Sequence, residues 1–369
     1  MKLSNRHAAV LAGVLTLAGS AAPMAAAKDK REDRSGRAEP LVIAHRGASA
    51  YRPEHTLGAY RLAIGMGADY IEPDLVATKD HQLVARHENE ISGTTDVAQH
   101  PEFAPRRTTK QIDGRPVTGW FTEDFTLAEL RTLRAIERLP QLRPSNTAFD
   151  GLYEVPTLQE VIDLAEREGV GIYPETKHPT YFDSIGLSLE EPLVATLKAN
   201  GWDRPSSPVF IQSFEVSNLQ ELNRKIRVPL EQLTSASGRP YDFTAKGDPR
   251  TYADITSREG LREVARYADG LGPDKNQIVP RDAQNRLQEP TRLVDDAHRA
   301  GLKVHPYTFR PENEFLPEDF REGNPASPEY RRARGDQPAE LALFYRLGVD
   351  GLFADNPDTA VAVRKRVSR

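Results

Sequence analysis

One unit recurs along the chain from residue 41 onward: an amphipathic helix, a glycine, a short apolar strand and then a polar residue. Its helix and strand fall at 57–67 and 70–75, 158–169 and 171–174, 193–201 and 209–212, 261–267 and 270–272, 293–301 and 302–307, and 341–348 and 349–354. Further strands at 41–44 and around 226–233 bring the number of strands to eight. Strands of nearly continuous apolar character that alternate with helices are typical of a parallel sheet covered by helices. The pattern predicts an α/β fold, a TIM-type (β/α)8 barrel.

One long segment, at about residues 90–154, interrupts this rhythm and is far longer than an ordinary strand-to-helix connection. It contains a helix signal over residues 127–139 that begins with the capping-box pair Thr126 and Glu129. An aromatic cluster in the segment favours an ordered structure over a disordered excursion: Trp120, Phe121 and Phe125. We therefore predict a small insertion domain after the second strand, over the mouth of the barrel.

The first 27 residues have the layout of a secretory signal peptide. Lys2 and Arg6 precede an apolar run at 8–17 and a small-residue stretch at 25–27. The run is too short for a good membrane span, so no stable membrane anchor is expected. We predict cleavage near residue 27, export to the periplasm or the extracellular space, a disordered leader at 28–40, and the barrel at 41–369.

Net charge and cysteine content narrow the class of protein. Removing Lys2 and Arg6 with the signal peptide changes the formal net charge from -5 to -7. The mature chain lacks the basic excess of a nucleic-acid-binding protein, so no nucleic-acid partner is expected. There is no cysteine, which excludes disulfides and a lipoprotein attachment site, and a chain of this length buries a sufficient core without them. Nothing in the sequence specifies an oligomeric state.

Carboxylates follow two of the predicted strands: Glu72 and Asp74 on one, and Glu175, with Lys177, on the other. Residues i and i+2 of a strand face the same way, and the carboxyl ends of barrel strands form the active-site mouth. Three carboxylates that converge there repel each other unless a cation neutralises them. Ligands made only of oxygen favour a hard divalent cation, and we expect Ca²⁺, with Mg²⁺ as the alternative. The competing interpretation is that Glu72 and Glu175 only form salt bridges with Lys177 and Arg46.

His45 and His87 are the candidates for acid/base chemistry. A phosphodiester needs its nucleophile deprotonated and its leaving alkoxide protonated, and imidazole titrates close enough to neutral pH for either role. Arg46 offers a bidentate fork to a phosphate, and Gly47 leaves room for a close approach. The sequence does not decide which histidine is the base, or whether water attacks directly or a glycerol hydroxyl attacks first to form a cyclic phosphate.

The sequence gives weaker evidence for the roles of the other residues near the predicted site. Lys177 would add a second positive charge, and Phe214 and Tyr307 would form an aromatic wall, although core packing explains both aromatics equally well. His305 is expected behind the site rather than on the substrate. The remaining histidines are interpreted as structural or exposed: His7, His81, His100, His178 and His298.

Together the motifs resemble the glycerophosphodiester phosphodiesterase family, and within it the secreted GlpQ-like branch. The resemblance covers residues 41–363 and rests on residues 45–49, 53–56, 72–74, 87, 173–177, 304–308 and 348–353. It implies a TIM-type barrel with an insertion after the second strand. It also implies metal-dependent hydrolysis of small glycerophosphodiesters, such as glycerophosphocholine and glycerophosphoethanolamine, to sn-glycerol 3-phosphate and an alcohol.

The resemblance also implies roles for individual residues. It places the metal on Glu72, Asp74 and Glu175, acid/base roles on His45 and His87, and phosphate contact on Arg46, while Lys177, Phe214 and Tyr307 match substrate-contact positions less tightly. The chain departs from the family pattern at three positions. His55 stands where Asn is common and is expected to brace a loop, Glu88 replaces a common Asp after the second histidine, and Asn356 replaces an aromatic residue.

Two other functions fit the same scaffold. A phospholipase-type phosphodiesterase acting on intact lipids would need an exposed apolar rim, for which the insertion offers only its aromatic cluster. A non-catalytic secreted binding or adhesion protein is disfavoured because no predicted histidine or metal carboxylate has been lost.

Overall fold

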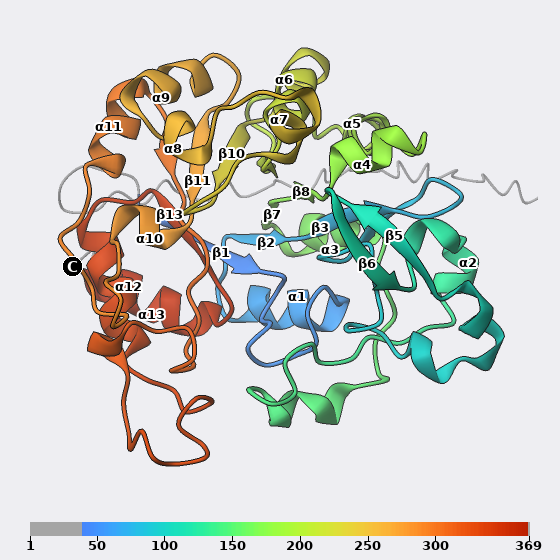
Figure 1. Cartoon of the computed structure of the whole chain (residues 1–369), viewed down its shortest axis with the longest axis horizontal. Coiled ribbons are helices and arrows are strands. Elements are labelled where there is room, and N and C mark those ends of the chain that lie inside the picture. Colours follow the sequence, from blue (N-terminus) through green and yellow to red (C-terminus); the bar gives the residue numbers. More distant parts are fainter. Residues whose placement is uncertain (1–38, 368–369) are drawn as a thin grey trace, which may run out of the picture. The chain divides into compact units, whose positions relative to one another are not determined.

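The computed structural model describes residues 39–367, so the predicted signal peptide and most of the predicted leader lie outside the described residues. Strands and helices alternate along this part of the chain, with the strands in the middle and helices around them (Figure 1). The barrel strands are β1 (Leu41–His45), β2 (Tyr70–Glu72) with β3 (Asp74–Ala77), β7 (Gly171–Ile172) with β8 (Glu175–Thr176), β9 (Ile211–Ser213), β10 (Leu230–Thr234), β11 (Gly270–Pro273), β12 (Lys303–Val304) and β13 (Gly351–Ala354). The predicted eight strand positions are therefore confirmed.

These strands pair in parallel in two sheets, with the orders β13-β1-β2-β7 and β12-β11-β10-β9-β8-β3, and the short β4 (Leu83–Ala85) pairs antiparallel with β3. Pro73 separates β2 from β3, and Pro174 separates β7 from β8, so each of these two barrel strands is divided between the two sheets. Proline has no backbone N–H to donate to a neighbouring strand. Backbone contacts nevertheless cross both seams. One is a parallel bridge between Ile172 and Val209, and the other is a hydrogen bond of 3.1 Å from Phe353 N to Pro306 O. The fold is α/β of the TIM-barrel type.

Two of the helices that cover the strands begin at the predicted capping signals. The Thr157–Glu160 capping box and the Asp336 N-cap are both present. The longer helices are α1 (Leu57–Gly65), α3 (Leu158–Glu168), α5 (Glu190–Ala199), α6 (Val216–Lys225), α9 (Arg258–Val264), α11 (Leu293–Ala300), α12 (Gln337–Arg346) and α13 (Pro357–Val367). The shorter ones are α4 (Pro179–Ser184), α7 (Tyr241–Lys246), α8 (Tyr252–Ile255), α10 (Lys275–Ile278) and the 3₁₀ turn η5 (Glu318–Phe320).

Residues 90–154, between the loop after β4 and the start of α3, form what we call the insertion segment. It consists of the hairpin β5 (Thr108–Ile112) and β6 (Arg115–Gly119), the helix α2 (Leu127–Leu130), and the 3₁₀ turns η1 (Val97–Gln99), η2 (Pro101–Arg106), η3 (Thr122–Asp124) and η4 (Pro144–Phe149). Its three clustered aromatic residues, Trp120, Phe121 and Phe125, are 9% exposed or less. They therefore form part of the core rather than a surface patch.

The predicted helix over residues 127–139 is wrong, because α2 ends at Leu130. Its Thr126 capping box is present, but the chain then becomes extended. Ala135 pairs with Thr95 and donates its N–H to Tyr153 O over 2.8 Å, and Ile136 N donates to Thr94 O over 3.0 Å. Tertiary strand pairing has overridden the local helix preference of this stretch.

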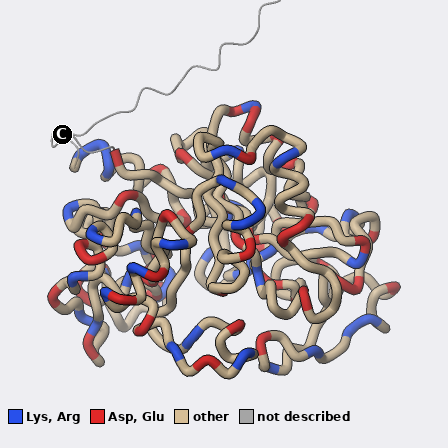
Figure 2. Tube along the Cα trace, turned by 90° about the horizontal axis from the view of Figure 1, so that it is seen from above, with Lys and Arg blue, Asp and Glu red and all other residues tan. Residues whose placement is uncertain are grey.

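Within residues 39–367, no helix is both long and apolar enough to cross a membrane. Lys and Arg are interspersed with Asp and Glu along the described chain in the view of Figure 2. Charges of both signs are therefore mixed along the trace in this view.

Candidate active site

The register of the parallel strands brings the predicted site residues to one edge. His45 lies opposite Glu72, and Glu175 lies between Asp74 and Gln212. Eight of the nine predicted site residues line a single cavity of about 130 Å³: His45, Arg46, Glu72, His87, Glu175, Lys177, Phe214 and Tyr307. The ninth, Asp74, lies directly behind it between Glu175 and His55.

Glu72, Asp74 and Glu175 form an acidic triad whose oxygens lie within 4.8 Å of one another, and all three are buried. Burial and the neighbouring Asp74 raise the pKa of Glu72 well above its usual value. Burial, opposed by Lys177 and helped by Asp74, raises the pKa of Glu175 to about 8. The buried Oδ1 of Asp74 has no hydrogen-bond partner. An oxygen-only set that is crowded and incompletely satisfied fits a divalent cation.

The salt bridges of the competing interpretation are present only in part. Lys177 Nζ lies 2.9 Å from Glu175 Oε1, and Arg46 Nε lies 3.4 Å from Asp74 Oδ2. Glu72 accepts hydrogen bonds from the Arg46 backbone N–H, over 2.7 Å, and from the Gln212 amide, over 3.2 Å. Within residues 39–367 it forms no ion pair, so simple charge pairing does not account for the whole triad.

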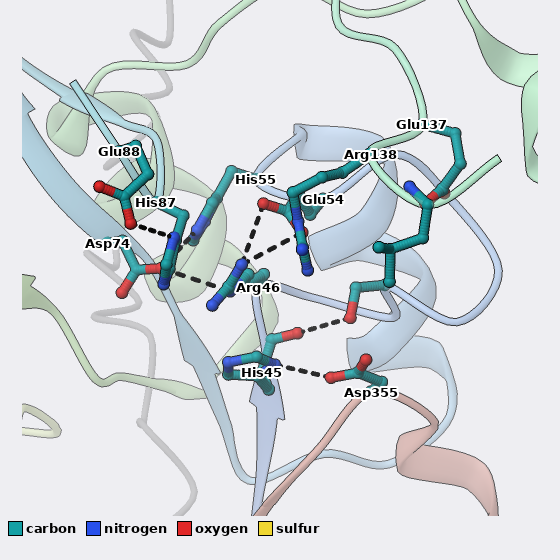
Figure 3. Close-up of polar contacts among 12 residues, drawn as sticks. His45, Arg46, Glu54, His55, Asp74, His87, Glu88, Glu137, Arg138 and Asp355 are labelled. Atoms are coloured by element: carbon teal, nitrogen blue, oxygen red, sulfur yellow. Dashed lines mark hydrogen bonds and ion pairs between the residues drawn. The ribbon is translucent and has the colours of Figure 1, made fainter. Parts of the chain in front are cut away.

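His45 is backed by a carboxylate on its Nδ1. That nitrogen lies 2.6 Å from Asp355 Oδ1 (Figure 3). Asp355 Oδ2 lies 2.6 Å from Arg143 and 3.2 Å from Arg310. Burial and the nearby Arg46 guanidinium lower the pKa of His45 to about 4. A carboxylate at Nδ1 favours the tautomer with its proton there, which leaves Nε2 available to a substrate.

His87 has the same arrangement on the other side of the cavity. Its Nδ1 lies 2.8 Å from Glu88 Oε1 (Figure 3). The His87 side chain is 28% exposed. Burial together with Arg46 and Lys177 lowers its pKa. Each of the two histidines therefore has a carboxylate that can fix its tautomer.

Arg46 lies between the two histidines and is held by a second ion pair. Its Nη1 lies 3.1 Å from Glu54 Oε1, and Arg138 Nε of the insertion segment lies 2.7 Å from Glu54 Oε2 (Figure 3). The backbone of Arg46 is left-handed, with φ +60°, and Gly47 follows with φ +87°. Strained backbone conformations of this kind are common at functional sites, where the surrounding contacts hold them in place.

The two predicted aromatic residues meet at the cavity wall. The Phe214 and Tyr307 rings pack edge to face with centroids 5.9 Å apart, and Lys177 Nζ lies 5.7 Å from the Phe214 centroid. The Tyr307 hydroxyl donates to Thr234 O over 3.0 Å. Both rings therefore line the cavity and pack against each other, and a contact with the substrate stays a prediction.

Two histidines outside the predicted site have specific surroundings. His55 Nε2 lies 2.8 Å from Asp74 Oδ2, so it braces a carboxylate of the triad. His55 and Arg46 hold the pKa of Asp74 well below its usual value, although burial opposes them. His305 is buried against Glu231 and Tyr173 and does not line the cavity.

The sequence did not reveal the polar residues that support the site from behind. Asp355 is one of the polar residues that follow a predicted strand, but that position alone gives it no role behind His45, and Glu54, Arg138 and Arg143 have no periodic signal. His178, predicted to be structural or exposed, has a largely buried side chain that contacts Glu88.

Comparisons with known proteins were made on sequence and on structure. Residues 45–359 match the glycerophosphoryl diester phosphodiesterase family. A glycerophosphodiester phosphodiesterase of Arabidopsis thaliana, GDPD6, is 37% identical over 86% of this chain and 83% of its own. A glycerophosphodiester phosphodiesterase of Haemophilus influenzae is 30% identical over the full length of both chains.

Solved structures show the same fold at lower sequence identity. A glycerophosphoryl diester phosphodiesterase from Silicibacter pomeroyi superposes with a TM-score of 0.61 at 20% identity, over 89% of this chain and 93% of its own. A phosphodiesterase of Oleispira antarctica in complex with the product sn-glycerol-3-phosphate gives a TM-score of 0.58 at 20% identity, over 88% and 97%. The chain is an enzyme that belongs to the glycerophosphoryl diester phosphodiesterase family.

Proposed function

We propose that this enzyme hydrolyses small glycerophosphodiesters, such as glycerophosphocholine and glycerophosphoethanolamine, to sn-glycerol 3-phosphate and an alcohol in a metal-dependent reaction. One observation carries the proposal: two histidines, each with a carboxylate at Nδ1, line the same cavity as Arg46, Lys177 and two members of the acidic triad. The names of the relatives and the product complex of the Oleispira antarctica enzyme support the substrate class.

The chain's own groups account for binding and proton transfer. Arg46 and Lys177 donate to the phosphate oxygens and offset their charge. One of the two histidines takes the proton from the attacking hydroxyl, supplied by water or by the glycerol of the substrate. The other histidine acts as an imidazolium: as the P–O bond to the leaving alcohol breaks, it gives that alkoxide its Nε2 proton and becomes neutral.

The acidic triad would hold the cation, for which we propose Ca²⁺, with Mg²⁺ as the alternative. The raised pKa of Glu72 and Glu175 and the unpartnered Oδ1 of Asp74 support this assignment. A bound divalent cation would neutralise charge on the phosphoryl oxygens. Lys177 and Gln212 would then orient Glu175 and Glu72 through the contacts described above.

The test is turnover of a panel of glycerophosphodiesters and intact phospholipids by purified enzyme, scored by release of sn-glycerol 3-phosphate. We expect product from the small diesters and near-complete loss of turnover in His45→Ala and His87→Ala, with circular dichroism unchanged. Substantial activity in either variant would break the acid/base assignment, and no product from any diester would refute the function. Turnover of phospholipids alone would favour a lipase, although the aromatic residues that such a rim requires are buried.

Export is a further part of the proposal. It rests on residues 1–27, which lie outside the described residues. N-terminal sequencing of the mature protein recovered outside the cytoplasm should start near residue 28. An intact N-terminus on protein found only inside the cell would contradict it.

A further inference from the structure

A chain of polar contacts runs from the insertion segment to His87. Asp113 Oδ2 lies 2.6 Å from His178 Nδ1, and His178 Nε2 lies 2.8 Å from Glu88 Oε2. The other oxygen of Glu88, Oε1, lies 2.8 Å from His87 Nδ1. The four residues come from three places: the turn of the β5–β6 hairpin, the position after Lys177, and the loop after β4.

The backbone at His178 is strained in a way that packing alone does not explain. Its φ is +52°, in the left-handed region, and it precedes Pro179, which disfavours helical conformations of either hand in the residue before it. Asp113 also has a positive φ, but it precedes Gly114 in a two-residue hairpin turn, where that conformation is ordinary. The strain at His178 is sustained by contacts at both of its ring nitrogens.

The protonated form of His178 fits its place between the carboxylates of Asp113 and Glu88. Although burial opposes it, hydrogen bonds with Asp113 and Glu88 raise the pKa of His178 to about 9. Both ring nitrogens of the resulting imidazolium donate, one to each carboxylate. Glu88 is thereby kept ionised with one oxygen occupied, and its second oxygen is left to accept the Nδ1 proton of His87.

We propose that His178 and Asp113 are positioning residues that act through Glu88 to hold His87 in the tautomer and orientation that presents Nε2 to the phosphodiester. The role in catalysis rests on the proposed function. His45 has a corresponding support, since Arg143 lies 2.6 Å from the Asp355 oxygen that faces away from the imidazole. The outermost residue in both cases, Asp113 or Arg143, belongs to the insertion segment, which therefore supports both acid/base groups from behind.

The experiment compares His178→Gln and Asp113→Asn with a matched control, His100→Gln. His100 also lies between two carboxylates near the insertion hairpin, Asp96 at 3.4 Å and Glu102 at 3.1 Å, but it contacts no site residue. Two experiments are made on each variant. Steady-state kinetics on a small glycerophosphodiester give kcat and KM, and the ¹⁵N NMR signals of the His87 ring report its tautomer without any turnover.

For His178→Gln we expect kcat to fall roughly 10- to 100-fold with KM changed less than about threefold, because the change affects proton transfer rather than binding. Asp113→Asn should lower kcat less, and adding it to His178→Gln should have little further effect, because both act along one path. The His87 ring should lose its preference for a proton on Nδ1 in His178→Gln, and the control should match wild type.

The proposal would be overturned if His178→Gln kept kcat within about twofold of wild type, or if His87 kept its proton on Nδ1. Should His178→Gln not fold, Asp113→Asn decides alone, because it changes a half-buried turn side chain by a single atom; an unchanged His87 tautomer there refutes the proposal. Absence of turnover in the wild type would refute the proposed function, while the tautomer measurement still tests the positioning role.

Discussion

Asp355 is the carboxylate behind His45, and Asp355→Asn removes its charge while keeping its shape. The side chain is 1% exposed, and its oxygens lie 2.6 Å from His45 Nδ1, 2.6 Å from Arg143 and 3.2 Å from Arg310. An amide here can satisfy the arginines with its oxygen only by turning its NH₂ toward Nδ1. His45 would then adopt the opposite tautomer, with its proton on Nε2, and Nε2 could no longer accept a proton.

The wrong tautomer at a carboxylate-backed histidine lowers kcat by roughly 10² to 10⁴-fold, equivalent to about 3–5 kcal/mol of transition-state stabilisation. Stability should also fall, because removing one partner of a buried ion pair costs about 3–5 kcal/mol. Arg143 keeps its 2.7 Å contact with Glu312, so we expect the lower end of that range. The loss of kcat and the loss of stability both follow from removing the charge of Asp355, but they are measured separately.

The stability of the folded protein also depends on pH through the carboxyl group of Asp355. Although burial opposes them, Arg143 and Arg310 hold the pKa of Asp355 well below its usual value. Its stabilising contribution is therefore present above about pH 4, the unfolded value, and is lost as the pH falls toward the folded value. The stability gap between wild type and Asp355→Asn should narrow in acid.

The assay combines urea unfolding with kcat measured well below the unfolding midpoint of the variant. Asp350→Asn is the matched control, because Asp350 precedes β13, pairs with His298 over 2.8 Å and lies away from the cavity. It should lose stability while keeping kcat. If Asp355→Asn kept kcat within about threefold of wild type, Asp355 would be a structural partner only, and the reasoning about the tautomer would be refuted.

Gly47→Ala should destabilise the protein by about 2–4 kcal/mol, because a Cβ at φ +87° would lie 2.7 Å from the Ala59 carbonyl carbon; an unfolding free energy within 0.5 kcal/mol of wild type would contradict this. The raised pKa of His178, about 9, makes its ionic contribution complete below pH 6.5 and lost as the pH rises through 9. The stability gap between wild type and His178→Gln should thus shrink by about 2–3 kcal/mol over that interval, and a constant gap would disprove it. Lys177→Gln should raise KM about tenfold by removing a charged phosphate contact, whereas an unchanged KM would remove Lys177 from the binding site.

The sequence was sufficient to predict which residues meet at the cavity, because most of them stand at strand ends. A strand is recognised from its own few residues, and parallel strands place their carboxyl ends at one edge. His45 and Glu72, which are distant in sequence, therefore had to meet, as did Asp74 and Glu175. The fold class followed from the same repetition.

The support behind the site could not be predicted in this way. Arg143 and Asp113 come from the insertion segment, where no repeated pattern fixes the position of any residue. The helix over 127–139 failed for a related reason, since Ala135 pairs with Thr95, which is distant in sequence. Such contacts depend on how the insertion packs against the barrel, which local preferences do not encode.

The most direct test of the account is release of sn-glycerol 3-phosphate from glycerophosphocholine by enzyme stripped with a chelator and then resupplied with Ca²⁺. Glu72, Asp74 and Glu175 are crowded and incompletely neutralised without a cation, so we expect the rate to fall at least about 100-fold on stripping and to return on addition of Ca²⁺ or Mg²⁺. Asp74→Asn should abolish that recovery. Equal rates before and after verified removal of the metal would contradict the central claim.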